Sequence, residues 1–236
     1  ISMVTETDLG SGFVTSAGAF VHCYFNSNRA RNMIRMDDTG ATLSKDGTSA
    51  VEIRIRVAQA TAAMARLNRI WKSKIGFPTK YKLFKSLVIS ILLYGCESWT
   101  LMADSEKKVQ AFENKSLRRL LGISWREHKT NEYVRKKVED IVGPQETLLA
   151  TVKRRKLAWF GHVTRHNSLS KTTMQGTEPG GRRRGRQRKS WGDNIKEWTA
   201  MTTPDLLRAA DNRTEWRGKS VSAASMSPPR PQMSRD

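Results

Sequence analysis

The segment between Pro78 and Gly95 constrains the fold more than any other part of the chain. Its large apolar residues recur with the spacing i, i+1, i+4 and i+5, which places them along one side of an α-helix; they are Leu83, Phe84, Leu87, Val88, Ile91 and Leu92. Proline is common in the first turn of a helix, and glycine is common just after the last turn. The pattern therefore predicts a central helix between these two residues, and its apolar content predicts that this helix is the most buried element.

Other segments with helical signals lie on both sides of the central helix. Ser49 and Glu52 stand three residues apart, as in a capping box, and are interpreted as the start of the first segment. The apolar face of that helix is expected to consist of Val51, Ile55, Ala58, Ala62 and Ala65. Gly122 follows another segment as a stop signal. Together these signals predict helices over about residues 50–73, 102–121, 130–143 and 144–165, joined by short loops.

Composition divides the chain into regions. The stretch ATLSKDGTS, residues 41–49, is typical of a short strand and a turn. Two short helices are expected near the C-terminus, around residues 191–198 and 204–216, and their tryptophans are expected to form a small core. The predicted fold is all-α, with an irregular or disordered segment (1–39), a helical bundle with a short N-terminal strand (40–166), a disordered basic linker (167–190), a small Trp-rich helical module (191–217) and a disordered tail (218–236).

The charge of the chain is strongly unbalanced, with 42 lysines and arginines against 22 acidic residues and a net charge of +20. Residues 151–190 alone carry about +11, so about half of the excess lies in one short stretch. Such a field attracts polyanions, and nucleic acid is the expected partner, with an anionic membrane surface as the weaker alternative. No apolar run approaches the roughly 20 residues of a transmembrane helix, and the two cysteines fit a reducing compartment. We therefore expect an intracellular protein that does not enter a membrane.

The densest cluster of positive charge is the basic strip, which comprises Arg182, Arg183, Arg184, Arg186, Arg188 and Lys189. A flexible segment of this kind can follow a phosphate backbone and release condensed counterions, with little sequence preference. The same residues would also serve as a solubilising linker or as a nuclear-import signal, and these roles do not exclude nucleic-acid contact. The expected location is the nucleus.

Two further groups are candidates for nucleic-acid contact. The stretch KRRKLAWF contains Lys153, Arg154, Arg155 and Lys156, which cannot all share one helix face. Its Trp159 could stack on an unpaired base, although a tryptophan in this position more often packs in a core. Arg118 and Arg119 lie beside apolar residues on the helix predicted over 102–121, where they would contact either a nucleic-acid backbone or only solvent.

Five strings occur in order along the chain: SLVISILLYGCESWTL, AFENKSLRRLLGISWREHKTNEYVR, RRKLAWFGHVTRH, GGRRRGRQRKSWGDNIKEW and DNRTEWR. Over about residues 40–216 the sequence resembles the C-terminal part of a LINE-type (non-LTR) retrotransposon reverse transcriptase. The resemblance implies that residues 50–143 correspond to the thumb and the remainder to the extension beyond it. It also implies binding of an RNA–DNA template–primer duplex and of target DNA, in a polyprotein that carries an endonuclease and a Mg²⁺-dependent RNA-directed DNA polymerase.

The catalytic residues of such a polymerase are not evident in this chain. Asp37 and Asp38 have the appearance of an Asp-Asp box, but Arg35 stands where that box has an aromatic residue. Two-metal catalysis needs carboxylates that converge from separate segments, and only Glu6 and Asp8 lie upstream. We therefore expect a fragment with no catalytic centre and no cofactor of its own, and interpret the pair as a polar turn. It would function beside the separate palm and endonuclease portions.

Two alternatives complete the predictions. His162 and His166 are four residues apart, but no glutamate or cysteine stands near them, so a zinc site is not expected. A function of a different class is also open: the bundle would be a protein-interaction module, and the basic strip would only direct nuclear import.

Overall fold

The computed structural model describes residues 49–166, 171 and 189–225, together with the backbone of four short strands nearer the N-terminus. The strands pair as two antiparallel hairpins, β1 (Gly12–Val14) with β2 (Phe20–His22), and β3 (Ile34–Arg35) with β4 (Thr42–Leu43). β4 falls in the stretch for which the sequence predicts a short strand. The other residues of the predicted irregular segment 1–39, including Asp37 and Asp38, lie outside the described residues.

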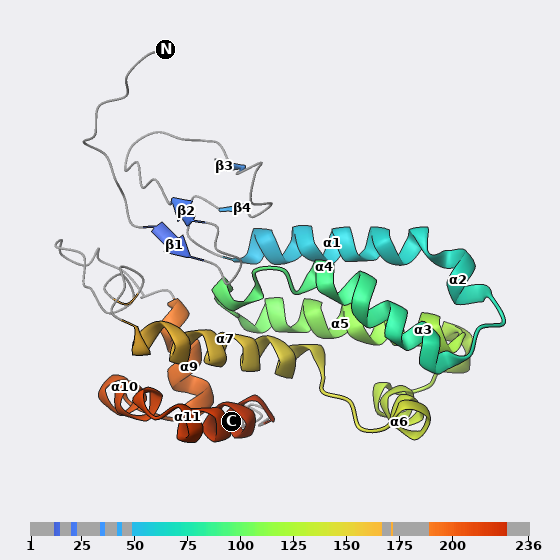
Figure 1. The fold of residues 1–236 in the computed structure, drawn as a ribbon. Helices are drawn as coiled ribbons and strands as arrows, with labels where there is room; N and C mark the ends of the chain where they lie inside the picture. The colour runs from blue at the N-terminus through green and yellow to red at the C-terminus, as the bar shows by residue number, and fades with distance from the viewer. Residues whose placement is uncertain are drawn as a thin grey trace, which may run out of the picture.

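The rest of the described chain is helical, which confirms the predicted all-α class (Figure 1). The bundle comprises α1 (Ala50–Arg66), α2 (Asn68–Lys72), α3 (Phe77–Leu83), α4 (Ser90–Leu92), α5 (Ala103–Leu121), α6 (Asn131–Val142) and α7 (Leu148–Arg165). Three short turns interrupt it, a π-helical segment η1 (Phe84–Ile89) and the 3₁₀ segments η2 (Cys96–Ser98) and η3 (Trp125–Glu127). The C-terminal helices are α9 (Trp191–Thr199), α10 (Thr203–Asp211) and α11 (Arg213–Ser225). Among the helices of the described residues, none combines the length and the apolar character needed to cross a bilayer.

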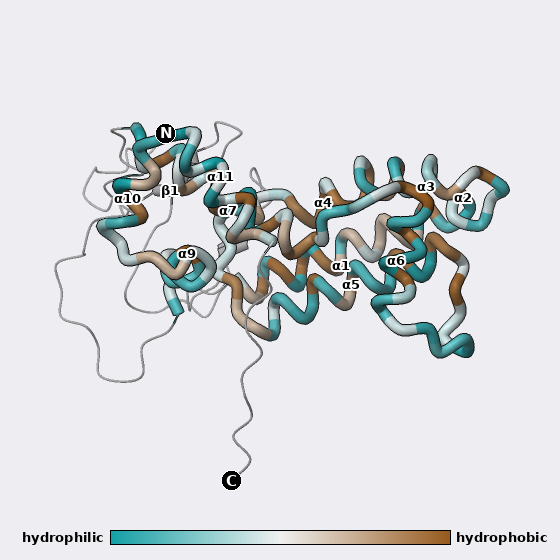
Figure 2. Tube along the Cα trace, turned by 90° about the horizontal axis from the view of Figure 1, so that it is seen from below, coloured by the Kyte–Doolittle hydropathy of each residue, from teal (hydrophilic) through white to brown (hydrophobic). Residues whose placement is uncertain are grey.

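The predicted central helix is formed by α3, η1 and α4 in succession. Val88 and Leu92 are fully buried and contribute to the main core, but Leu87 is 44% exposed. A π-helical turn holds more residues than an α-helical turn, so it shifts the side chains that follow around the axis. The regular spacing used for the prediction is therefore interrupted at η1. In Figure 2 the apolar residues of α1, α4 and α5 lie along the line where these helices meet.

The buried face of α1 differs from the predicted one. Its buried residues are Glu52, Ile53, Arg56, Ala60 and Met64, whereas the predicted Ala58, Ala62 and Ala65 are exposed. The larger Ile53 and Met64 bury more apolar surface than alanines can. The charged members of this face are accommodated because Arg56 Nε donates a hydrogen bond of 2.7 Å to Glu52 Oε1, one turn earlier. Side-chain size and an ion pair within the helix therefore determine which face of α1 is buried.

Ser49 does not cap α1 as the capping-box interpretation predicts. Its hydroxyl accepts a hydrogen bond of 2.9 Å from the backbone N–H of Thr100, which is 51 residues away. We expect Ser49→Ala to lower the free energy of unfolding by about 1 kcal/mol, because that amide would lose its acceptor. Urea unfolding measures the change. Ser222→Ala is the control, since that exposed hydroxyl bonds to Gly218 O within its own helix; equal effects of the two substitutions would contradict the tertiary role.

The C-terminal helices do not form a separate module with a core of its own. Trp191, Trp198 and Trp216 pack onto the bundle, and the buried residues of α9, α10 and α11 belong to one continuous core with those of α7. The indole N–H of Trp216 donates to Leu157 O at 2.8 Å, and that of Trp191 donates to Glu97 O at 2.9 Å. The tryptophans were expected to pack on one another because few apolar residues lie near them in sequence, but α7 supplies the missing surface.

The predicted boundaries at this end also change. α11 continues to Ser225, so the disordered tail predicted from residue 218 is wrong for residues 218–225, where Ser220, Ala223 and Ala224 are buried. Asn212 separates α10 from α11, because its side chain accepts from the backbone N–H groups of Thr214 and Glu215. Within the predicted linker only Lys171, Lys189 and Ser190 are among the described residues.

Candidate nucleic-acid interface

Lys156 was a predicted phosphate contact, and the structure places it in the interior instead. Its side chain is fully buried, and its Nζ donates to Trp99 O at 2.8 Å and to Asn194 Oδ1 at 3.0 Å. The same nitrogen lies 4.5 Å from the centre of the Trp191 ring. Burial lowers the pKa of this lysine to about 6, because the charged form is separated from water. Lys156 therefore joins α7 to α9 and cannot reach a phosphate in this fold.

Lys153 is also buried, with 2% of its surface exposed, and its Nζ lies 5.4 Å from the centre of the Trp198 ring. Burial lowers the pKa of Lys153, and the carboxylates of Glu106 and Glu197 partly offset the effect. A long side chain can cover apolar surface with its methylene groups, which is what this lysine does between α7 and α9. The prediction that Lys153 contacts a phosphate is therefore wrong for this fold.

The remaining residues of this cluster lie nearer the surface, but each has a partner. Arg154 donates to both carboxylate oxygens of Glu146, which raises the pKa of the guanidinium. Arg155 donates to Leu93 O at 3.2 Å. Trp159 is half-buried and meets the Trp191 ring edge to face, with 5.2 Å between ring centres. The core interpretation of Trp159 therefore fits its surroundings better than base stacking does.

The basic strip is described only at its end. Arg182, Arg183, Arg184, Arg186 and Arg188 lie outside the described residues. Lys189 forms an ion pair with Glu197 of α9. That pair neutralises one of the six cations, so the strip's charge depends on the five arginines.

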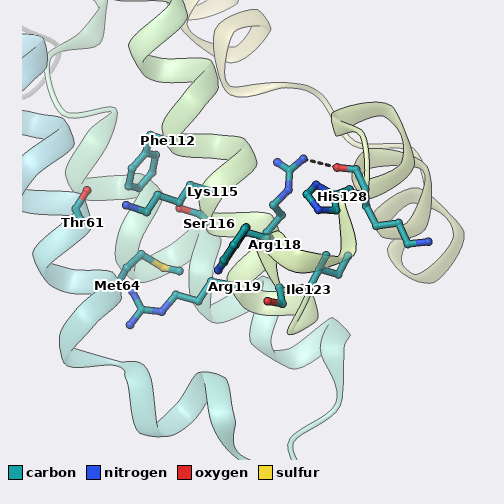
Figure 3. A pocket seen from close by; sticks show the side chains of 12 residues that line it. Thr61, Met64, Phe112, Lys115, Ser116, Arg118, Arg119, Ile123 and His128 are labelled. Atoms are coloured by element: carbon teal, nitrogen blue, oxygen red, sulfur yellow. Dashed lines mark hydrogen bonds between the residues drawn. The ribbon is translucent and has the colours of Figure 1, made fainter.

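The structure brings Arg118 and Arg119 into a cleft of about 600 Å³ between α1, the C-terminal half of α5 and η3 (Figure 3). Its lining residues are Thr61, Met64, Phe112, Lys115, Ser116, Arg118, Arg119, Ile123, Ser124, Trp125, His128 and Lys129. Figure 3 shows Lys115 and Arg119 reaching from α5 toward α1, with His128 on the opposite side. The lining contains four lysines and arginines and no aspartate or glutamate. We call it the cationic cleft.

Neutral groups, rather than carboxylates, position the arginines of the cationic cleft. Arg118 donates to Asn131 Oδ1 at 2.7 Å and to Lys129 O at 2.9 Å, which ties α5 to the start of α6. Arg119 donates to Asn68 Oδ1 of α2 at 3.1 Å. Among residues 49–166, 171 and 189–225, no carboxylate forms an ion pair with either guanidinium or with Lys115. The positive charge of the cleft therefore remains available to an anion.

The most exposed large apolar side chain of the described residues also lines this cleft. Trp125 is 77% exposed on η3, next to Arg126, whose guanidinium carbon lies 5.9 Å from the ring centre. A capping box holds this turn: the Ser124 hydroxyl accepts from Arg126 N, and the Glu127 carboxylate accepts from Ser124 N at 2.8 Å. Sequence reasoning missed Trp125. The signal was present, because Ser124 and Glu127 stand three apart directly after the Gly122 stop.

No metal centre is formed in the described part of the chain, where no three histidine, cysteine, aspartate or glutamate side chains are placed to share an ion. The rings of His162 and His166 lie 4.7 Å apart at the end of α7.

Comparison with known proteins gives one informative similarity. The chain is 31% identical over 149 residues to a transposon-derived protein of Caenorhabditis elegans, an alignment that covers 58% of this chain and 52% of that protein. The chain thus spans about half the length of the curated relative that it matches. No protein-family model and no solved structure matches it. The chain is related to a transposon-derived protein, which points to an origin in a transposable element.

Proposed function

We propose that this chain is the nucleic-acid-binding C-terminal part of a LINE-type reverse transcriptase, which holds nucleic acid through backbone contacts and has no catalytic centre of its own. The transposon-derived relative supports the element origin, and the resemblance of the quoted strings supports the reverse transcriptase. In the full polyprotein, these helices would hold the RNA–DNA duplex or the target DNA in the nucleus, beside the palm and the endonuclease. The Mg²⁺ used in catalysis would belong to that palm.

The observation that carries the proposal is the cationic cleft. Lys115, Arg118 and Arg119 face one opening with no carboxylate among the lining residues. Phosphate groups bind such a surface with release of counterions, and the contact carries no sequence information. The arginines of the basic strip would extend the contact along the strand.

Salt-dependent binding tests the proposal. The probes are a labelled RNA–DNA hybrid and duplex DNA, measured from 50 to 300 mM salt. We expect a log–log slope of roughly −5 or steeper for the chain, because the slope falls by about 0.9 for each phosphate contact on a duplex. Replacing the five arginines of the strip by alanine should make that slope shallower, by the amount that corresponds to the loss of about four to five phosphate contacts. Lys189 is left unchanged because it pairs with Glu197.

A cleft variant separates the cationic cleft from the strip. Lys115→Gln with Arg119→Gln should weaken binding at 100 mM salt and make the slope shallower by about two contacts. Lys107→Gln with Lys108→Gln is the matched control, because it removes the same charge from exposed positions of the same helix outside the cleft. Equal losses in the two double variants would show a diffuse charge effect and contradict a site at the cleft. A chain with no affinity, whose strip variant only fails to enter the nucleus, would support the protein-interaction alternative.

A further inference from the structure

We propose that Trp125 is a stacking platform for an unpaired base of the strand whose phosphates the cationic cleft holds. The inference rests on the proposed function and makes it specific: the cleft would prefer single-stranded RNA or DNA, or an overhang, to a blunt duplex. It starts from the position of Trp125, because an indole that is 77% exposed gains little from the core of its own chain.

The turn that carries Trp125 is held in place by residues before and after it in the sequence. Ser124 and Glu127 close the capping box, and His128 follows with a φ of 47°, an uncommon value for a residue other than glycine. The His128 ring meets the indole at 6.4 Å in a T-shaped arrangement. A ring held in this way has little freedom to lose when a planar ligand stacks on it. The backbone therefore presents the indole to solvent in a defined orientation.

The surroundings of the indole indicate the chemistry of its ligand. The lining of the same cleft combines Lys115, Arg119 and Lys129 with apolar side chains and contains no acidic residue. A ligand that satisfies both parts needs a flat apolar face and a negative charge a few bonds away. A nucleotide unit has this composition, and stacking on an aromatic ring accepts any base because every base has a π face.

Stacking on Trp125 requires a base with at least one face that no neighbouring base covers. This requirement distinguishes single strands from duplexes. In a duplex both faces of each base are covered, except at the ends. The base pairs inside a duplex can therefore use the cations of the cleft but not the indole, whereas every base of a single strand can use both. This difference separates stacking from simple charge attraction.

The test compares Trp125→Ala with Trp125→Phe in the full chain. The ligands are a 12-nucleotide single strand, as RNA and as DNA of the same sequence, and a long blunt duplex without a loop, whose internal base pairs far outnumber its ends, at one salt concentration. We expect Trp125→Ala to weaken single-strand binding about tenfold and duplex binding less than about twofold, and Trp125→Phe to retain most of the affinity. A strand with abasic sites should be bound with equal affinity by the unmodified chain, by Trp125→Ala and by Trp125→Phe, because it has no base to stack on residue 125. Different losses for RNA and DNA would show which strand the site accepts.

Tyr94→Ala is the matched control, since Tyr94 is also an exposed aromatic but does not line the cleft. Thermal unfolding of Trp125→Ala should match that of the unmodified chain, because the side chain is 77% exposed. If the unmodified chain binds and Trp125→Ala weakens both strand types equally, or neither, the stacking role is wrong and the proposed function stands. If the unmodified chain binds neither strand type, the proposed function itself fails.

Discussion

Gly161→Ala will loosen the attachment of α11 to α7 and lower the free energy of unfolding by about 3 kcal/mol, because the site has no room for a methyl group. A Cβ at Gly161 would lie 2.3 Å from both Cδ1 and Nε1 of Trp216. The indole cannot move aside easily: it is 3% exposed, its N–H donates to Leu157 O at 2.8 Å, and its ring lies 5.3 Å from that of Phe160. The clash outweighs the roughly 1 kcal/mol that alanine gains over glycine inside a helix.

Urea unfolding followed by far-UV circular dichroism measures the effect of this substitution. Gly218→Ala is the control, because Gly218 also lies inside a helix and nothing stands within 4 Å of the position of its Cβ. That variant should be more stable by about 0.5–1 kcal/mol. If Gly161→Ala also stabilises the chain, the close packing of α11 on α7 is wrong.

Lys156→Met should flatten the dependence of stability on pH. The pKa of Lys156 is lowered to about 6 in the folded chain, while an unfolded lysine titrates at about 10.4. Between these values the unfolded chain binds more protons, so the free energy of unfolding rises with pH, by up to about 1.4 kcal/mol per unit from this residue. Below about pH 6 both states are protonated and this contribution to the slope disappears.

The readout for Lys156→Met is the slope between pH 6.5 and 8.5, over which the unmodified chain should gain about 2–3 kcal/mol more than the variant. Absolute stability is less informative, because methionine also leaves Trp99 O without the hydrogen bond that Lys156 donates. Lys107→Met is the matched control at an exposed position, and it should leave the slope unchanged. If the free energy of unfolding depends on pH in the same way in the unmodified chain and in Lys156→Met, the buried amine remains charged in the folded chain over this pH range.

Local signals in the sequence predicted some helix ends closely, although the segment predicted over residues 50–73 is divided into α1 and α2. The segment predicted over residues 102–121 is α5, Ala103–Leu121, and Gly122 ends it with a φ of 69°, which glycine adopts without steric cost. Thr130 caps α6 through its hydroxyl, close to the predicted start. α7 begins later than predicted, at Leu148, because Thr147 and not Pro144 provides the start. Signals of this kind act over four or five residues, so the sequence displays them directly.

The sequence also determined the fold class of the protein and its net charge. Helical periodicity over residues 50–165 decided the all-α fold, and the excess of lysine and arginine favoured a polyanionic partner. Both properties are sums over residues, and neither depends on which helix meets which.

Only the tertiary structure decided which side chains are buried and which meet in one site. Lys156 is hidden because Trp99 O and Asn194, 57 and 38 residues away, satisfy its hydrogen bonds. The cationic cleft exists because α1 and α5 pack side by side and η3 projects Trp125 beside them. The side-chain pattern of one helix shows that a residue can lie on a face, but the burial of that face depends on a partner distant in the sequence. For that reason a prediction based on charge alone chose Lys153 and Lys156, which are buried, as phosphate contacts, and it missed the exposed Trp125.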